Sequence, residues 1–276
     1  MSGWLLLQAL VLGLVEGLTE FLPVSSTGHL ILAGRALGFR ADALGQAFEV
    51  FIQLGAILAV CWEYRARLLA VAGGLPRDPA ARAFAARLLL AFLPVAAVGL
   101  AAAGWIKGYL FRPLPVALAF VLGGLVILWV EARQRRRPPR VLTVDAMGWR
   151  EALWVGLAQV AALVPGTSRS GATIVGGMLA GLSRRAATEF SFFLAIPVML
   201  AASGYELLKA WPSLDGAYGA AFAVGFAAAF LSAFAATRAL LRFVSRHTLA
   251  PFAWYRIAFG LLLLAVYREE LLGAWA

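Results

Sequence analysis

Long apolar runs, separated by short arginine-rich segments, constrain the fold of this chain more than any other feature. We expect membrane-spanning helices over 46–64, 85–107, 114–132, 187–209, 217–240 and 251–267. Each run is long enough to cross ~30 Å of hydrocarbon. Hydrophobic residues make up 62% of the sequence, more than a soluble domain contains. Strand-like alternation does not recur, which argues against an outer-membrane barrel. The sequence therefore predicts an all-α polytopic membrane protein.

The positive charge of the chain is concentrated in a few short loops. The net charge is +10, and the arginines gather at 65–82, at RQRRRPPR (133–140) and at 238–246. Such clusters mark cytoplasmic loops and contact anionic lipid head groups, so we expect membrane lipids and no nucleic acid as partners. Cys61 is the only cysteine, which excludes an intrachain disulfide. The N-terminus lacks the basic region of a cleaved signal peptide.

The sequence contains an internal repeat. LPVSSTGH (22–29) is similar to VPGTSRSG (164–171), and AFEVFIQLGAILAV (47–60) is similar to ATEFSFFLAIPVML (187–200). The offset is 142 positions between Pro23 and Pro165, and 140 between Glu49 and Glu189. We therefore expect two repeats, 1–140 and 148–276, that form one integral membrane domain.

Each repeat is predicted to begin with a re-entrant segment. Residues 3–37 and 150–182 are long and apolar, but Pro, Ser, Thr and Gly interrupt both at the centre. Non-helical backbone at membrane depth must be buried in protein or line a wet cavity, so we interpret each as a helix–loop–helix that enters and leaves on one side. Three crossings per repeat then make the second repeat inverted, with six crossings in total. Placing both termini outside puts most arginines inside, and the two broken loops are expected to meet near the midplane.

The first broken segment, EGLTEFLPVSSTGH, combines carboxylates, hydroxyls and a histidine. Glu16 and Glu20 are one helical turn apart and share a face. Two such charges within a membrane require protonation, a cationic partner or a metal ion. Ser25, Ser26 and Thr27 precede or begin the next helix, where they act as caps or present an anion site. His29 follows within one turn and is a candidate acid/base residue.

The second broken segment, PGTSRSG, has the composition of a phosphate site. Gly166 and Gly171 allow close approach of the backbone to a ligand. The hydroxyl groups of Thr167, Ser168 and Ser170 add donors, and the Arg169 guanidinium matches phosphate oxygens. An alternative role for Arg169 is an ion pair with Glu16, Glu20 or Glu189.

A divalent cation would allow the acidic first segment and the basic second segment to bind the same phosphate. Arg169 and two helix N-termini attract an anion, whereas Glu16 and Glu20 repel one. A metal ion on the two glutamates, shared with a phosphate, removes the conflict and is typical of metal-assisted phosphoryl transfer. The alternative for the glutamates is a protonated pair in helix–helix hydrogen bonds.

EGLTEFLPVSSTGH and PGTSRSG resemble the two signature motifs of the undecaprenyl-diphosphate phosphatase family of the bacitracin-resistance type. FEVFIQLGAILAV is similar to a third stretch of that family, and the likeness covers nearly the whole chain. The resemblance implies a bacterial inner-membrane enzyme that hydrolyses undecaprenyl diphosphate with Mg²⁺ or Ca²⁺ and recycles the lipid carrier of cell-wall synthesis. It also places functional roles on the residues Glu16, Glu20, Ser26, His29 and Arg169.

The expected mechanism leaves the nucleophile open. Ser26 with His29 as general base is preferred, and Glu20 is an alternative base. Direct attack by His29 and attack by water are the other possibilities. The substrate is expected to enter from the outer side, with Arg169 and the amides of 166–171 binding its phosphates.

A second function fits the same architecture. Inverted repeats with broken helices are typical of transporters, so a polyprenyl-phosphate flippase, alone or combined with a phosphatase, is the alternative. The sequence also leaves a homodimer open.

Overall fold

Helices make up most of the described chain. The structure, a computed structural model, describes residues 3–39, 42–210 and 218–267. Its elements are α1 (Gly3–Thr19), α2 (Ser26–Leu37), α3 (Ala43–Glu63), α4 (Arg65–Gly74), α5 (Pro79–Tyr109), α6 (Pro113–Arg136), α7 (Trp149–Val160), the 3₁₀ turn η1 (Ala161–Leu163), α8 (Arg169–Ala180), α9 (Arg184–Ala210), α10 (Gly219–Val244) and α11 (Ala250–Val266). Within these ranges, the only β pairing is an isolated bridge between Val141 and Leu182.

Five helices are long and apolar enough to cross a membrane. They are Leu44–Glu63 in α3, Pro79–Ala102 in α5, Pro113–Arg136 in α6, Arg184–Leu208 in α9 and Gly219–Val244 in α10. Five of the six expected spans are thereby confirmed as candidate membrane helices, and the chain is an all-helical, multi-pass membrane protein. The sixth, 251–267, falls on α11, an apolar helix of 17 residues, and its crossing stays a prediction.

Two expectations fall partly on residues that the structure does not describe. The outer loop expected near 211–216 lies outside the described residues, and so do the two chain ends, 1–2 and 268–276. The side of the membrane on which the termini lie therefore stays a prediction.

Both interrupted segments form helix–loop–helix hairpins. The segment 3–37 contains α1 and α2, and Gln8 Nε2 on α1 donates to the Leu37 carbonyl at the end of α2 (2.8 Å). The segment 150–182 contains most of α7, then η1 and α8. A Cβ atom at Gly176 on α8 would overlap Ala158 on α7, so glycine permits their close packing. The helix breaks are confirmed, whereas the re-entrant path through a membrane remains a prediction.

The first of two compact units comprises residues 1–22, 29–85 and 192–240. Its core consists of buried side chains from α1, α2, α3 and α10, namely Ala9, Leu12, Leu30, Phe48, Ile52, Ala221 and Ala229. Small residues bring α1 close to α10, because a Cβ atom at Gly13 would overlap the Gly225 carbonyl and one at Gly17 would overlap Ser232 Oγ. This packing holds the end of α1, which carries Glu16, close to α10.

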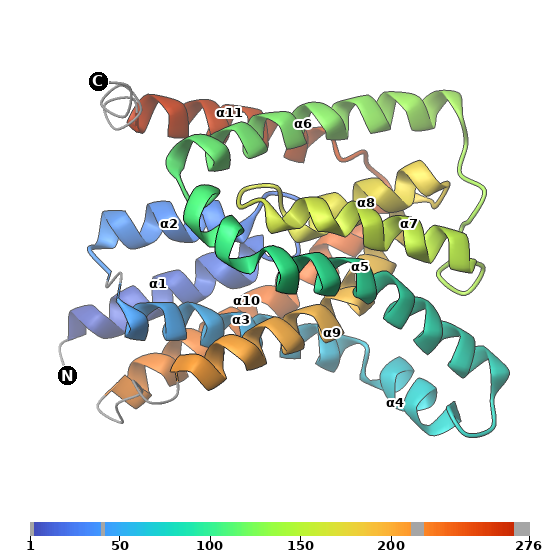
Figure 1. Ribbon diagram of the computed structural model, residues 1–276, viewed down its shortest axis with the longest axis horizontal. Coiled ribbons are helices and arrows are strands. Elements are labelled where there is room, and N and C mark those ends of the chain that lie inside the picture. Colours follow the sequence, from blue (N-terminus) through green and yellow to red (C-terminus); the bar gives the residue numbers. More distant parts are fainter. Residues whose placement is uncertain (1–2, 40–41, 211–217, 268–276) are drawn as a thin grey trace. The chain divides into compact units, whose positions relative to one another are not determined.

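The second unit comprises residues 23–28, 86–191 and 241–276. Helices α6 and α11 pack along each other (Figure 1), and their contact includes the buried residues Val116, Ala117, Phe120 and Leu263. The α7–α8 hairpin packs on α5, where a Cβ atom at Gly156 would overlap Ala91.

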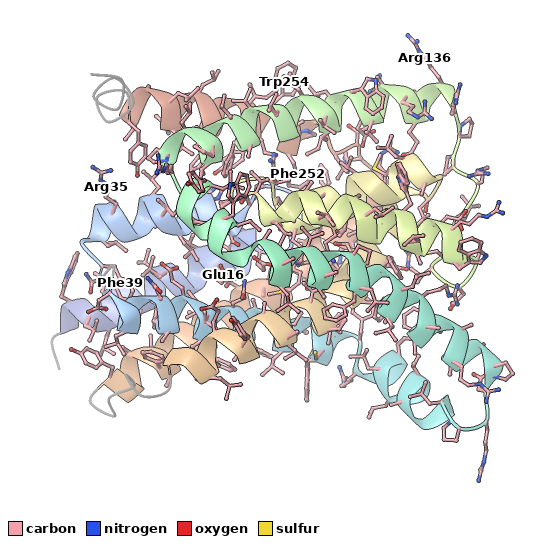
Figure 2. The ribbon with its side chains drawn as sticks, viewed as in Figure 1. Glu16, Arg35, Phe39, Arg136, Phe252 and Trp254 are labelled. Carbon is pink, nitrogen blue, oxygen red and sulfur yellow. The ribbon has the colours of Figure 1, made fainter. Side chains whose placement is uncertain are left out.

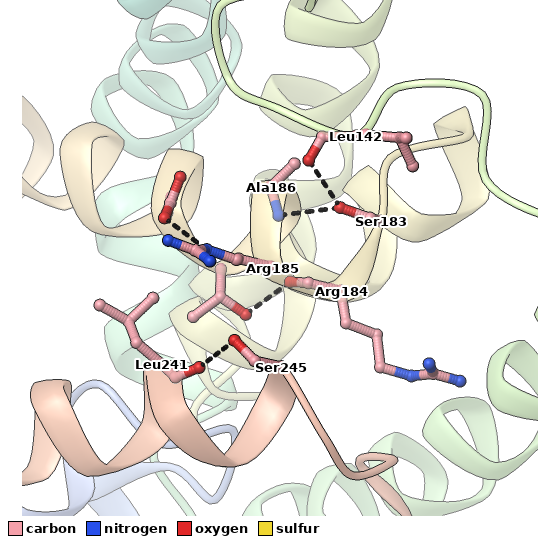
Figure 3. Close-up of polar contacts among 9 residues, drawn as sticks. Leu142, Ser183, Arg184, Arg185, Ala186, Leu241 and Ser245 are labelled. Carbon is pink, nitrogen blue, oxygen red and sulfur yellow. Dashed lines mark hydrogen bonds and ion pairs between the residues drawn. The ribbon is translucent and has the colours of Figure 1, made fainter.

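The segment that joins the two halves of the chain is tied to the end of α8. Ser183 Oγ donates to the Leu142 carbonyl (3.1 Å) and accepts from the Ala186 amide (3.2 Å), as Figure 3 shows. Both compact units contain segments from each half of the sequence. The division into repeats at 1–140 and 148–276 stays a prediction.

Candidate active site

The two glutamates of the first hairpin lie on one helical face. Helix α1 ends at Thr19, but the Glu20 amide donates to the Glu16 carbonyl (2.9 Å), so the helical turn continues to Glu20. Glu16 is 1% exposed and Glu20 is 8% exposed. Because residues four apart in a helix are neighbours on its surface, the carboxylates project from the same side.

The hydroxyl residues after Pro23 form a sharp turn into α2. Ser25 has φ +69°, which is rare for a residue with a side chain, and α2 begins at the next residue, Ser26. Both serines are buried, whereas Thr27 and His29, in the first turn of α2, are half-buried. The sequence prediction that Ser25, Ser26 and Thr27 lie at the start of the second helix of the hairpin is confirmed, and the helix itself begins at Ser26.

The second hairpin repeats this turn. Gly166 has φ +91° and Ser168 has φ +72°, and α8 begins at the next residue, Arg169. Ser168 Oγ accepts from the Gly171 amide (3.0 Å) and lies 3.0 Å from Ser170 Oγ. Ser25 and Ser168 are the two non-glycine residues with positive φ among the described residues. Strained backbone of this kind clusters at functional sites.

Glycine is required at position 166 by geometry as well as by conformation. A Cβ atom there would approach the Val116 carbonyl oxygen to 2.5 Å and the Ala119 side chain to 3.2 Å. The loop backbone therefore lies directly on α6, and the orientation of the following residues depends on this contact.

Arg169 is fixed against α9. Its Nη1 donates to the Ser191 carbonyl (3.2 Å), and Thr173, one turn further along α8, lies 2.7 Å from Ser191 Oγ. Glu189, one of the expected ion-pair alternatives for Arg169, accepts from Arg185 (3.1 Å). Arg169 is the first residue of α8, where helix amides favour an anion, and its guanidinium is held at Ser191 of α9.

Arg256 on α11 joins the two broken loops, and sequence reasoning missed it. Its side chain is fully buried, and it is the largest such side chain among the described residues. Nη1 donates to the Pro23 carbonyl of the first loop (3.3 Å), and Nη2 donates to the Gly166 carbonyl of the second (3.0 Å). The backbones of the two predicted loops therefore lie side by side.

The same guanidinium also binds α6. Nη2 donates to the Ala119 carbonyl (2.9 Å), Nε donates to the Phe120 carbonyl (3.4 Å), and the charge lies 5.3 Å from the Phe120 ring centroid. Gly123 makes room for it, since a Cβ atom there would overlap the guanidinium. The sequence does contain a signal, because Arg256 is the only charged residue in the apolar run 251–267, and intramembrane arginines are usually functional or paired.

The donor set of the first hairpin suits a shared metal ion. Among the described residues, no group of three or more His, Cys, Asp or Glu side chains is positioned to hold one. Mg²⁺ is commonly bound by one or two carboxylates together with substrate phosphates and water. Glu16 and Glu20 are two buried carboxylates on one face, so they fit a metal that the substrate completes.

Comparison with known proteins assigns the family. Residues 9–262 match the family described as bacitracin resistance protein BacA. The chain belongs to this family. It is 59% identical over 261 residues to undecaprenyl-diphosphatase 2 of Rhodospirillum rubrum, with 95% of this chain and 94% of the relative covered. It is 60% identical to undecaprenyl-diphosphatase of Laribacter hongkongensis, with 95% of each chain covered. The corresponding protein of Methylococcus capsulatus is 58% identical, with 98% and 97% covered. The resemblance inferred from the two loop motifs is thus confirmed.

Proposed function

We propose that this protein is an integral membrane phosphatase that hydrolyses undecaprenyl diphosphate to undecaprenyl phosphate and inorganic phosphate. The observation that carries this proposal is identity of 58–60% to undecaprenyl-diphosphatases over 95% or more of the chain. Its substrate is a polyprenyl diphosphate lipid. The strained loops at Ser25 and Ser168, each followed by a helix N-terminus, support a phosphate site.

The second hairpin binds the phosphates in this proposal. Arg169 supplies a planar pair of donors, and the first-turn amides of α8 face the same anion. The hydroxyl groups of Thr167, Ser168 and Ser170 orient the phosphate oxygens. Gly166 and Gly171 keep the surface of the loop free of side chains, and Ser25 and Thr27 complete the contacts from the first hairpin.

Glu16 and Glu20 would hold a divalent ion, Mg²⁺ or Ca²⁺. When bound, the ion neutralises charge on the diphosphate, as in other phosphoryl-transfer enzymes. Glu16 and Glu20 then act as ligands rather than as acids. Glu20 remains the alternative general base.

Ser26 is the preferred nucleophile. Its Oγ attacks the terminal phosphorus while His29 accepts the hydroxyl proton. The bond from that phosphorus to the bridging oxygen breaks, and undecaprenyl phosphate leaves. The His29 imidazolium then loses this proton to the solvent, and the neutral ring deprotonates a water molecule that attacks the phosphorus bound to Ser26. As the bond between that phosphorus and Ser26 Oγ breaks, His29 acts as the acid and returns the proton to Ser26 Oγ, and inorganic phosphate leaves. Direct attack by His29 or by water gives the same products, and mapping a trapped phosphorylated residue distinguishes the three routes.

The family resemblance supports the bacterial inner membrane as the location of the enzyme in this proposal. Six helices cross the bilayer, with α11 as the sixth, and the hairpins 3–37 and 150–182 are re-entrant. Both termini and the opening of the active site face the outer side. The supporting observation is the concentration of arginines in the loops 65–84, 133–149 and 241–250, which are then cytoplasmic.

The direct test uses the purified full chain in detergent with a short-chain isoprenyl diphosphate. We expect release of inorganic phosphate that requires Mg²⁺ or Ca²⁺ and is abolished by a chelator. If phosphate is not released, while the protein moves polyprenyl phosphate across liposome membranes, the chain is a flippase and the proposal fails.

A further inference from the structure

We propose that a second site in this protein binds the phosphate group of an anionic membrane phospholipid. The site is a pocket of about 300 Å³ at the C-terminal end of α6, beside the end of α8. Arg133, Arg137 and Arg140 all line it, and we call it the basic pocket. Its role is independent of the phosphatase reaction proposed above.

The three arginines lie on two parts of the chain, the end of α6 and the segment that follows it. Arg133 lies in the last turn of α6, and Arg137 follows the helix directly as its C-cap, where its amide donates to the Arg133 carbonyl (2.9 Å). Arg140 lies on the segment that follows, where its amide donates to the Gly181 carbonyl (2.8 Å) and Nη2 donates to the Ala180 carbonyl (3.2 Å). These bonds hold Arg140 against the C-terminus of α8.

A glycine at the end of α8 leaves space for the Arg140 side chain. Gly181 has φ +103°, and a Cβ atom there would lie 3.1 Å from Arg140 Nε. Gln134, which also lines the pocket, donates to the Leu182 carbonyl (2.8 Å) and so fixes α6 to the same turn. Hydrogen bonds therefore fix both the wall of the pocket and one of its arginines in place.

Carboxylates do not neutralise this charge within the described part of the pocket. The residues that line it include three arginines and no Asp or Glu. Glu131, two positions before Arg133, forms an ion pair with Arg184 and accepts from the Leu249 amide (2.8 Å). Guanidinium groups that converge in this way match the oxygens of a phosphate group.

The position of the basic pocket favours a lipid over free phosphate. Helix α6 is a candidate membrane span that ends at Arg136, so its last turn lies where phospholipid head groups are found. Trp129 is 57% exposed and lies one turn before Arg133, as expected of an aromatic residue at the membrane interface. Met178 and Leu179 add apolar surface beside the charges. Basic pockets between membrane helices bind anionic lipid head groups in this manner.

The test measures lipid binding to the full chain by native mass spectrometry. Dioleoylphosphatidylglycerol is titrated against dioleoylphosphatidylcholine for the native protein, for the double variant R133Q/R137Q and for the control R135Q/R136Q. The control removes the same charge from the same end of α6, but Arg135 and Arg136 do not line the pocket, and Arg136 projects away from α8 (Figure 2). We expect the affinity for phosphatidylglycerol to fall about 30-fold (~2 kcal/mol) in R133Q/R137Q and less than about threefold in the control.

Equal losses in the two double variants would mean that lipid responds only to net charge, which overturns the proposal. No preference for phosphatidylglycerol in the native protein also overturns it. Inorganic phosphate is titrated in parallel by thermal unfolding, and a stabilisation that R133Q/R137Q abolishes, without a matching lipid effect, would assign the pocket to free phosphate instead. If the double variant does not fold, Arg137→Gln alone is used, because Arg137 is exposed and lies just beyond α6. A fivefold loss is then expected, and an unchanged affinity refutes the site.

Discussion

Replacing Arg256 with methionine should destabilise the protein and separate its two broken loops. Methionine retains much of the apolar stem of the side chain but provides no hydrogen-bond donors. The Ala119 and Phe120 carbonyls lie inside α6 and keep their helical partners. The Pro23 and Gly166 carbonyls lie in loops, where Arg256 donates to each of them. The substitution therefore acts chiefly on the loops.

The expected loss of stability follows from these two carbonyls. Leaving a buried acceptor unsatisfied costs about 1–3 kcal/mol, so two of them give about 2–6 kcal/mol. The loops should also shift, so we expect phosphate release to fall further than the stability loss alone explains. The matched control is Arg242→Met on α10, an exposed arginine whose replacement should change stability by less than about 0.5 kcal/mol.

The assay combines unfolding in detergent micelles with steady-state kinetics on a short-chain isoprenyl diphosphate. A second variant, Gly123→Ala, tests the same contact without removing the charge, because its Cβ atom would overlap the guanidinium. Gly104→Ala is its control, since a Cβ atom at Gly104 meets nothing within 4 Å. If Arg256→Met matches the native protein in both stability and kcat/KM, Arg256 does not hold the loops and the reasoning is wrong.

Four further substitutions test the proposed site. Arg169→Lys should lower kcat/KM about 100-fold, since a point charge does not reproduce paired contacts to phosphate; near-native kinetics would make Arg169 a structural residue. Glu16→Gln and Glu20→Gln should each reduce phosphate release by about 100-fold and weaken its response to added Mg²⁺, and an unchanged metal response would remove the glutamates from the metal site. Gly166→Ala should destabilise by about 2–4 kcal/mol, because alanine is strained at φ +91° and its Cβ would crowd Val116. Its control is Gly34→Ala, where a Cβ atom meets nothing within 4 Å, and equal midpoints of thermal unfolding for the two would contradict the argument.

The helices and their interruptions could be predicted because both depend on local sequence. Apolar runs fix where membrane helices form, and the small hydroxyl residues after Pro23 and Pro165 fix where the hairpins turn. Boundaries were less accurate. The run at 85–107 is part of α5, which begins at Pro79, because alanine-rich sequence extends the helix beyond its apolar part.

The role of Arg256 could not be predicted, for a physical reason. Its acceptors are backbone carbonyls, which every residue carries, so no side-chain pattern identifies them. Pro23 and Gly166 are also 233 and 90 positions away in the sequence. A lone arginine in an apolar run indicates that some partner exists, but only the fold reveals which one.

The two hairpins present the same backbone with different chemistry. In each, a serine with positive φ immediately precedes the second helix, and the first residue of that helix is Ser26 in one hairpin and Arg169 in the other. The N-terminus of α2 therefore carries a hydroxyl group, and the N-terminus of α8 carries a guanidinium. Phosphoryl transfer requires both a nucleophile and a group that neutralises the phosphate, and in the proposed mechanism Ser26 and Arg169, at the same position of two similar turns, take these two roles. Because Arg256 binds the carbonyls of Pro23 and Gly166, one residue of each loop, it sets how far apart the two turns lie.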